Sequence, residues 1–125
     1  MISHLSIGVS NLQRASAFYD AVLGALGYGR IFSGPASVGY GPPGGPERLA
    51  LKQRPASAIG VDAGFHLAFT ASDQASVDRF HKQAVALGGA DDGAPGLRPA
   101  YGPSYYAAFI VDHDGHRLEV VCQQP

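Results

Sequence analysis

Apolar residues alternate with small or polar ones in two short segments that lie half a chain apart. Between positions 4 and 9 every second residue is Leu, Ile or Val, and between 65 and 70 every second residue is Phe or Leu. A period of two is typical of a β-strand with one apolar face. We therefore predict one strand over 4–9 and another over 65–70.

Each alternating segment is followed by apolar residues at helical spacing, from 12 to 26 in the first half and from 77 to 87 in the second. This spacing predicts two helices, each with an apolar stripe that can cover a sheet face. Short polar residues precede both helices and are candidate N-caps: Ser10 or Asn11, and Ser72 or Asp73. Glycines follow both, at Gly27 and Gly88–Gly89.

Short strands broken by Gly and Pro follow each helix. In the first half we expect them over 30–32, 37–40 and 48–52, with GPPGGP as a turn. In the second half a long loop over 91–104 leads to strands over 105–111 and 117–122, joined by the turn Asp112-His113-Asp114-Gly115. These strands give the first half the order βαβββ. We predict the same order for the second half, although only two of its strands after the helix are placed, and the fold class is α+β.

The two halves follow one plan. An offset of 62 residues places His4-Leu5 on His66-Leu67, Phe18 on Phe80 and Gly27 on Gly89. We expect a single domain over 1–125 built from two repeated modules, about 1–60 and 61–125. If the modules pair into one curved mixed sheet, the helices lie on its outer face and the inner face forms a cup-shaped cleft.

Three polar residues share the strand faces that point away from the helices: His4, His66 and Glu119. Two imidazoles and one carboxylate suit a divalent metal ion such as Zn, Ni, Fe or Mn, with open positions for a substrate oxygen. Such an ion acts as a Lewis acid. Alternatively, each His is a hydrogen-bonded polar group, and Glu119 pairs with Arg117 or Arg98.

Composition narrows the classes of function. The 125 residues carry a net charge of −1, so no basic field is available to bind nucleic acid. No apolar run approaches the ~20 residues that a bilayer span needs, and the first residues lack a signal-peptide pattern. The single cysteine, Cys122, excludes an internal disulfide and a cysteine-based zinc site. We expect a cytoplasmic protein with no membrane partner.

Three segments, in order along the chain, carry a family resemblance: HLSIGVSNLQRASAFYDAVLGALGY, GFHLAFTA and FIVDHDGHRLEVV. They resemble the vicinal oxygen chelate superfamily, the group of glyoxalase I, bleomycin resistance proteins and extradiol dioxygenases. The last segment is similar to the family's D-P-D-G-x-x-x-E hairpin, with His113 where Pro is usual. The resemblance implies paired βαβββ modules around a U-shaped cleft, commonly in a homodimer.

The resemblance also implies a metal site at His4, His66 and Glu119, with Glu119 as a catalytic residue. The family's fourth position matches Ala50, which cannot bind a metal, and this argues against glutathione-hemithioacetal isomerase activity. We expect a glyoxalase-like, metal-dependent lyase or isomerase whose ion chelates vicinal oxygens of a small-molecule substrate. The alternatives are an extradiol-type dioxygenase and a metal-free, bleomycin-resistance-type ligand-binding protein.

Candidate substrate-binding residues lie near the expected cleft: Ser6, Arg98, Tyr105 and Tyr106. The two tyrosines are adjacent in a strand, so they point to opposite faces and only one can line the cleft. The loop around Arg98 is either a lid that holds an anionic or aromatic substrate or, as we favour, a Gly/Pro-rich turn. We interpret His81 as a half-buried packing residue, His113 and His116 as solvated, and Cys122 as a core residue.

Overall fold

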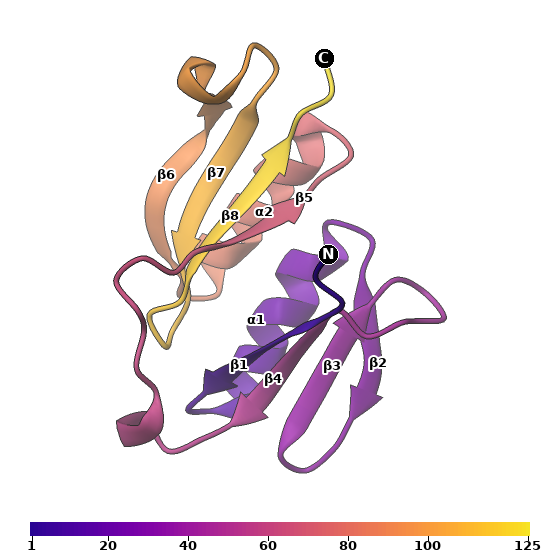
Figure 1. Cartoon of the computed structure of the whole chain (residues 1–125), viewed down its shortest axis with the longest axis vertical. Coiled ribbons are helices and arrows are strands. Elements are labelled where there is room, and N and C mark those ends of the chain that lie inside the picture. The colour runs from indigo at the N-terminus through magenta and orange to yellow at the C-terminus, as the bar shows by residue number, and fades with distance from the viewer. The chain divides into compact units, whose positions relative to one another are not determined.

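The computed structural model describes all residues, 1–125. The chain divides into two compact units, Met1–Gly60 and Val61–Pro125. Each unit has the element order βαβββ and forms its own four-stranded mixed sheet (Figure 1). The α+β class and the repeated βαβββ plan predicted from the sequence are confirmed. The strands form two separate sheets, where the sequence had suggested one curved sheet.

The first unit contains one helix and four strands: β1 (Leu5–Val9), α1 (Leu12–Gly24), β2 (Gly29–Ser33), β3 (Ser37–Gly41) and β4 (Leu49–Gln53). A short 3₁₀ turn, η1, spans Ala56–Ala58. The strand order is β1-β4-β3-β2, with β1 parallel to β4 and the other neighbours antiparallel. Helix α1 packs against β2, β3 and β4, so it covers one face of this sheet.

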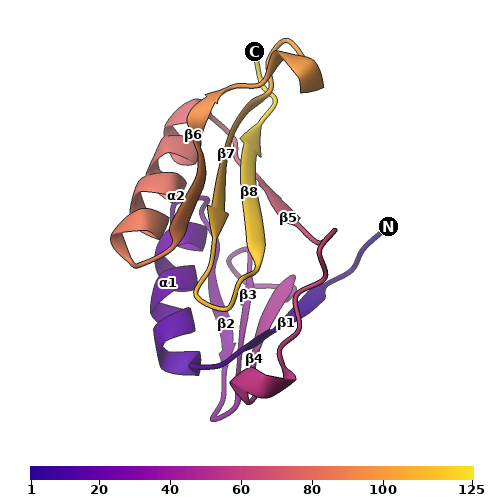
Figure 2. The ribbon, with the colours of Figure 1, turned by 90° about the vertical axis from the view of Figure 1, so that its left-hand side faces the viewer.

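The second unit repeats this arrangement with β5 (Leu67–Thr70), α2 (Gln74–Ala86), β6 (Ala90–Leu97), β7 (Tyr106–Val111) and β8 (Arg117–Cys122). A 3₁₀ turn, η2, spans Pro99–Tyr101. The strand order is β5-β8-β7-β6, again with one parallel pair, β5 and β8. Helix α2 packs against β6, β7 and β8, on one side of the sheet (Figure 2).

The core of each unit lies between the helix and the sheet. The helices contribute fully buried aromatic residues, Phe18 and Tyr19 from α1 and Phe80 from α2. Because side chains alternate along a strand, every second residue of each strand points away from the helix, to the opposite face of the sheet. That face carries Gly39 and Ala50 in the first unit and Phe109 and Glu119 in the second.

Both helices begin at short polar residues, as the sequence predicts. The side chain of Asn11 accepts a hydrogen bond from the Arg14 amide at 2.9 Å, and that of Asp73 accepts one from the Ser76 amide at 2.7 Å. These side chains satisfy amide groups that have no partner within the helix. Of the candidate caps, Asn11 and Asp73 therefore fill the role.

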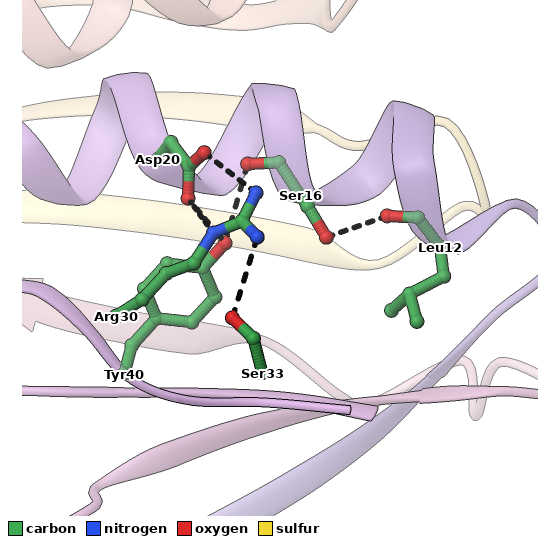
Figure 3. Close-up of polar contacts among 6 residues, drawn as sticks. All are labelled: Leu12, Ser16, Asp20, Arg30, Ser33 and Tyr40. Atoms are coloured by element: carbon green, nitrogen blue, oxygen red, sulfur yellow. Dashed lines mark hydrogen bonds and ion pairs between the residues drawn. The ribbon is translucent and has the colours of Figure 1, made fainter. Parts of the chain in front are cut away.

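A polar cluster joins α1 to the sheet of the first unit (Figure 3). Arg30 in β2 binds Asp20 in α1 through two hydrogen bonds, each 2.8 Å. The buried Tyr40 donates to the same carboxylate at 2.8 Å. Burial raises the pKa of Asp20, but the hydrogen bonds from Arg30 and Tyr40 outweigh it, and the pKa lies below its ordinary value. Burial and the Asp20 carboxylate raise the pKa of Tyr40.

Two expectations for the second unit need correction. The segment expected as a loop over 91–104 begins with the edge strand β6, which pairs with β7 through two irregularities around Gly93. An edge strand tolerates Pro95 because one side of its backbone needs no partner. His116, expected in solvent, is 7% exposed, and its ring packs edge-on against Phe65 with centroids 6.2 Å apart.

No helix of the chain combines the length and the apolar character that crossing a membrane requires.

Candidate functional site

The second unit contains a pocket of about 290 Å³ on the sheet face opposite α2. Strand β8 contributes Glu119, and the segment just before β5 contributes His66. The remaining lining residues are mostly aromatic or charged: Phe65, Tyr101, Tyr105, Phe109, Asp92 and Arg117, with Ala63, Gly64 and Leu118 at the edges. The pocket thus has an apolar aromatic wall beside a buried acid.

Glu119 is the central polar group of this pocket. Its side chain is only 5% exposed, and one carboxylate oxygen, Oε1, lies 3.2 Å from Nε2 of His66. The other oxygen, Oε2, accepts a hydrogen bond from the hydroxyl of Tyr105. A buried carboxylate is costly unless it is hydrogen-bonded, and both oxygens of Glu119 have partners. His66 is more open, with 57% of its side chain exposed, so its ring is accessible to a ligand.

Tyr105 is part of the same cluster. Burial, followed by the hydrogen bond to the Glu119 carboxylate and its negative charge, raises the pKa of the Tyr105 phenol to about 12. Tyr105 therefore stays protonated at neutral pH and acts as a donor. Its ring also packs against Tyr101, with centroids 5.3 Å apart. The hydroxyl and the ring stacking together fix one side of Glu119.

The donor atoms of His66 and Glu119 fit a shared metal ion. With bonds of ~2.1 Å, two ligands of one ion lie ~3.0 Å apart at a right angle and ~3.4 Å apart at a tetrahedral angle. The separation of 3.2 Å between Nε2 and Oε1 falls between these values. Neither unit gathers three or more His, Cys, Asp and Glu side chains in a group that could hold a metal ion.

The other predicted residues of the second unit lie outside this pair. Tyr106 points to the helix side of the sheet, where its hydroxyl donates to Asp78 of α2 at 2.6 Å. It does not line the pocket. Arg98 lies over the ring of Phe109, 5.5 Å from its centroid, and donates to the carbonyl of Ala94 at 2.7 Å. Arg98 therefore contacts a lining residue, Phe109, but does not itself line the pocket.

His4 and Ser6 belong to the first unit and line a pocket of about 470 Å³ there. His4 is exposed, and its Nδ1 lies 3.0 Å from the hydroxyl of Ser3. In the tautomer that donates from Nδ1, the lone pair on Nε2 is available for a ligand. Ala50 lies on the floor of this pocket, at the position that Glu119 has in the second unit.

Sequence reasoning missed several lining residues. Phe109 and Tyr101 are aromatic lining residues of the pocket in the second unit, and Glu47 and Lys52 bring charges to the pocket in the first. The parity of β7 does place Phe109 on the same face as Glu119, so this contact was accessible from the strand pattern. Glu47 precedes β4 in a Gly/Pro-rich turn, where no periodicity indicates the direction of a side chain.

The chain belongs to the Glyoxalase/Bleomycin resistance protein/Dioxygenase superfamily, whose family model matches residues 1–120. The resemblance noted from the three sequence segments is thereby confirmed. Membership of this superfamily does not specify one function, because the superfamily includes both enzymes and resistance proteins. No curated protein sequence matches the chain significantly.

Solved structures with the same fold cover nearly the whole chain. A glyoxalase/bleomycin resistance protein from Albidiferax ferrireducens is 30% identical, with a TM-score of 0.84 and 98% of each chain covered. A putative glyoxalase from Bacillus halodurans is 25% identical, with a TM-score of 0.72 and coverage of 98% of this chain and 95% of that one. The fosfomycin resistance protein FosX from Listeria monocytogenes is 18% identical, with a TM-score of 0.71 and coverage of 98% of this chain and 92% of that one. At this identity the similarity shows the fold alone.

Proposed function

We propose that the protein is a glyoxalase-like, metal-dependent enzyme of the lyase or isomerase type that acts on a small molecule. One observation carries this proposal. A buried carboxylate, Glu119, faces His66 at a separation that fits a shared ion, at the wall of a pocket large enough for a small substrate. Membership of the superfamily supports the same class of chemistry.

In this proposal His66 and Glu119 hold a divalent ion, and His4 stays a predicted ligand of such an ion. When bound, such an ion polarises a substrate oxygen and stabilises the negative charge that develops there. Tyr105 keeps the Glu119 carboxylate in one orientation through its hydrogen bond. An outer hydrogen bond of this kind orients a ligand and tunes its basicity, so Tyr105 is a positioning residue.

The aromatic wall defines the remainder of the proposed substrate site. Phe65, Tyr105 and Phe109 present apolar surface beside the polar pair, and Arg117 adds an exposed positive charge. Apolar walls with a few placed polar groups are typical of small-molecule sites. We expect a substrate with one apolar part and with adjacent oxygens that approach His66 and Glu119.

The test is metal binding by protein purified without a histidine tag. Titration calorimetry with Zn²⁺, Ni²⁺ and Mn²⁺, together with elemental analysis, is expected to give about one ion per chain for at least one metal. His66→Gln and Glu119→Gln should each weaken binding roughly 10-fold or more, since changes even beyond the ligands cost 10- to 100-fold.

His81→Gln is the matched control. His81 bonds Asp91 at 2.9 Å and is not among the residues that line the pocket, so this variant should bind metal like the wild type. Less than a tenth of an equivalent of metal, with no uptake on titration, would contradict the proposal. If a metal is bound, its identity limits the possible reactions, because Fe(II) favours dioxygenation and Ni(II) or Zn(II) favours lyase or isomerase chemistry.

A second candidate is a metal-free ligand-binding protein of the bleomycin resistance type. The aromatic lining residues Phe65, Tyr101, Tyr105 and Phe109 favour it, because such surfaces bind planar or apolar molecules without any ion. This candidate predicts that apolar aromatic ligands quench tyrosine fluorescence equally with and without a chelator. The enzyme proposal instead predicts that binding of an oxygen-chelating ligand requires the ion.

A homodimer and a location in the cytoplasm stay predictions. Light scattering of the full chain at several concentrations tests the first, and a mass of one chain at all of them would contradict it.

A further inference from the structure

The two units differ on the sheet face that points away from the helices. In the second unit Glu119 lies opposite Phe109 on the neighbouring strand. In the first unit the corresponding residues are Ala50 and Gly39, which lie directly opposite each other. The first unit therefore lacks both the acid and the large aromatic side chain, and its strands leave space above this pair.

The side chain of Glu47 occupies that space. A Cβ atom built on Gly39 would lie 1.8 Å from Oε1 of Glu47 and 2.8 Å from its carboxyl carbon. The carboxylate thus rests directly on the backbone of β3, where only glycine admits it. Directly opposite residues in an antiparallel pair have Cα atoms ~4.5–5.5 Å apart, so the carboxylate lies one strand away from Ala50.

The turn before Glu47 is held to the same strand. A Cβ atom on Gly41 would lie 2.1 Å from the carbonyl oxygen of Pro46. The amide of Arg48 donates to the carbonyl of Tyr40 at 2.7 Å. Contacts on both sides of Glu47 therefore fix the backbone from which its side chain projects over Gly39.

The carboxylate of Glu47 faces a pocket that also holds a metal-binding type of side chain. His4 and Ser6 line this pocket together with Glu47, and Lys52 brings one positive charge to it. No hydrogen bond or ion pair within the chain engages Glu47. An imidazole and a carboxylate in one pocket are suitable donors for a divalent transition metal ion.

We propose that Glu47, seated on Gly39, is a metal-binding carboxylate that acts with His4, replacing from the β3–β4 turn the acid that Ala50 does not supply. This inference rests on the proposed function, which gives the protein a divalent metal ion. The acid of the first unit comes from a turn, whereas that of the second comes from a strand.

Binding of Co²⁺ to the full chain tests this inference, with affinity and the visible absorption of the bound ion as readouts. Glu47→Gln removes the charge and keeps the shape of the side chain. Gly39→Ala keeps Glu47 but displaces its carboxylate. Each variant is expected to weaken Co²⁺ binding about 10-fold and to change the absorption spectrum. The double variant should lose little more than either single variant, because both remove the same interaction.

Gly29→Ala is the matched control for the glycine change, since a Cβ atom there meets no atom within 4 Å. This control should bind Co²⁺ like the wild type. Normal binding by Glu47→Gln, with binding weakened in Glu119→Gln, would overturn this inference and leave the proposed function intact. Absence of Co²⁺ binding by the wild type would overturn both. An effect of Gly39→Ala without one of Glu47→Gln would also overturn it, because the loss would then come from the sheet.

Discussion

The hydroxyl of Tyr105 donates a hydrogen bond to Oε2 of Glu119, whose other oxygen faces His66. One buried carboxylate therefore joins a phenol from the segment before β7 to an imidazole from the segment before β5. Because the Glu119 carboxylate helps to raise the pKa of the Tyr105 phenol, the ionisation of Tyr105 should respond to removal of the Glu119 charge.

We predict that Tyr105 ionises near pH 12, because burial first and the Glu119 carboxylate second raise its pKa to about 12. A raised pKa means that the protonated phenol stabilises the fold below the ordinary value and that this contribution is lost as the pH rises through the higher one. Stopped-flow pH jumps that follow tyrosinate absorbance, with Tyr105→Phe subtracted, measure this step. In Glu119→Gln the step should move to lower pH, and an unchanged step would contradict the assignment.

Asp20 is expected to make stability depend on acid pH. Its folded-state pKa lies below the ordinary value of 3.8, because hydrogen bonds from Arg30 and Tyr40 outweigh the effect of burial. The stabilisation from Asp20 is fully present above its ordinary pKa of 3.8. It is lost as the pH falls through the lower pKa that Asp20 has in the folded state. Asp20→Asn should therefore cost about 1–2 kcal/mol at neutral pH, since the cluster is partly exposed to solvent.

Urea unfolding between about pH 6 and pH 2 checks this prediction. The acid limb should be shallower in Asp20→Asn than in the wild type. Asp92→Asn serves as the control, because its carboxylate makes no hydrogen bond or ion pair with another side chain and lies far from α1 in sequence. An equal pH slope in the wild type and in Asp20→Asn would show that the cluster contributes nothing.

Gly41→Ala should weaken the β3–β4 turn. The new Cβ atom would lie 2.1 Å from the Pro46 carbonyl oxygen, which belongs to the backbone and cannot rotate away. We expect a loss of about 1–3 kcal/mol in the free energy of unfolding, the usual cost of forcing atoms into a filled space. Gly29→Ala, which meets no such atom, should be neutral or slightly stabilising. Equal stability of the two variants would contradict the packing of this turn.

Phe80 should be a dominant core residue of the second unit. It is fully buried on α2, and its ring centroid lies 5.8 Å from that of Phe69. Phe80→Ala is expected to cost about 3–5 kcal/mol in the free energy of unfolding. Val85→Ala on the exposed side of the same helix should cost about 0.5 kcal/mol or less. Phe80→Leu should give a measurable intermediate loss if the alanine variant fails to fold.

The helices and the strands of the repeated plan other than β6 could be predicted because their signals are local. The stripe around Phe80 follows directly from helical spacing. The sequence limited each cap to two adjacent residues, and the structure selects Asn11 and Asp73. Strand β6 could not be predicted, since its Gly and Pro residues are typical of loops, and only pairing with β7 makes it a strand. His116 was misjudged for a similar reason, because its burial depends on contact with Phe65, far away in sequence.

The candidate site could be predicted only in part. Strand parity placed Glu119 on the face away from α2, and the structure sets His66 beside it. The position of Glu47 could not be predicted from the sequence. It depends on Gly39 in β3, which has no side chain to occupy the space that the Glu47 carboxylate fills. A residue that matters by leaving room cannot be recognised from hydropathy or charge.

The contrast between the two acids also bears on how the chain can change over evolutionary time. Glu119 is anchored by strand pairing on both sides, so shifting it by one position would turn it to the opposite face. Glu47 projects from a connecting turn, and turns accept insertions and deletions more readily than the strands that they join. Changes in the length of this turn can therefore shift the carboxylate of Glu47, while that of Glu119 keeps a fixed position.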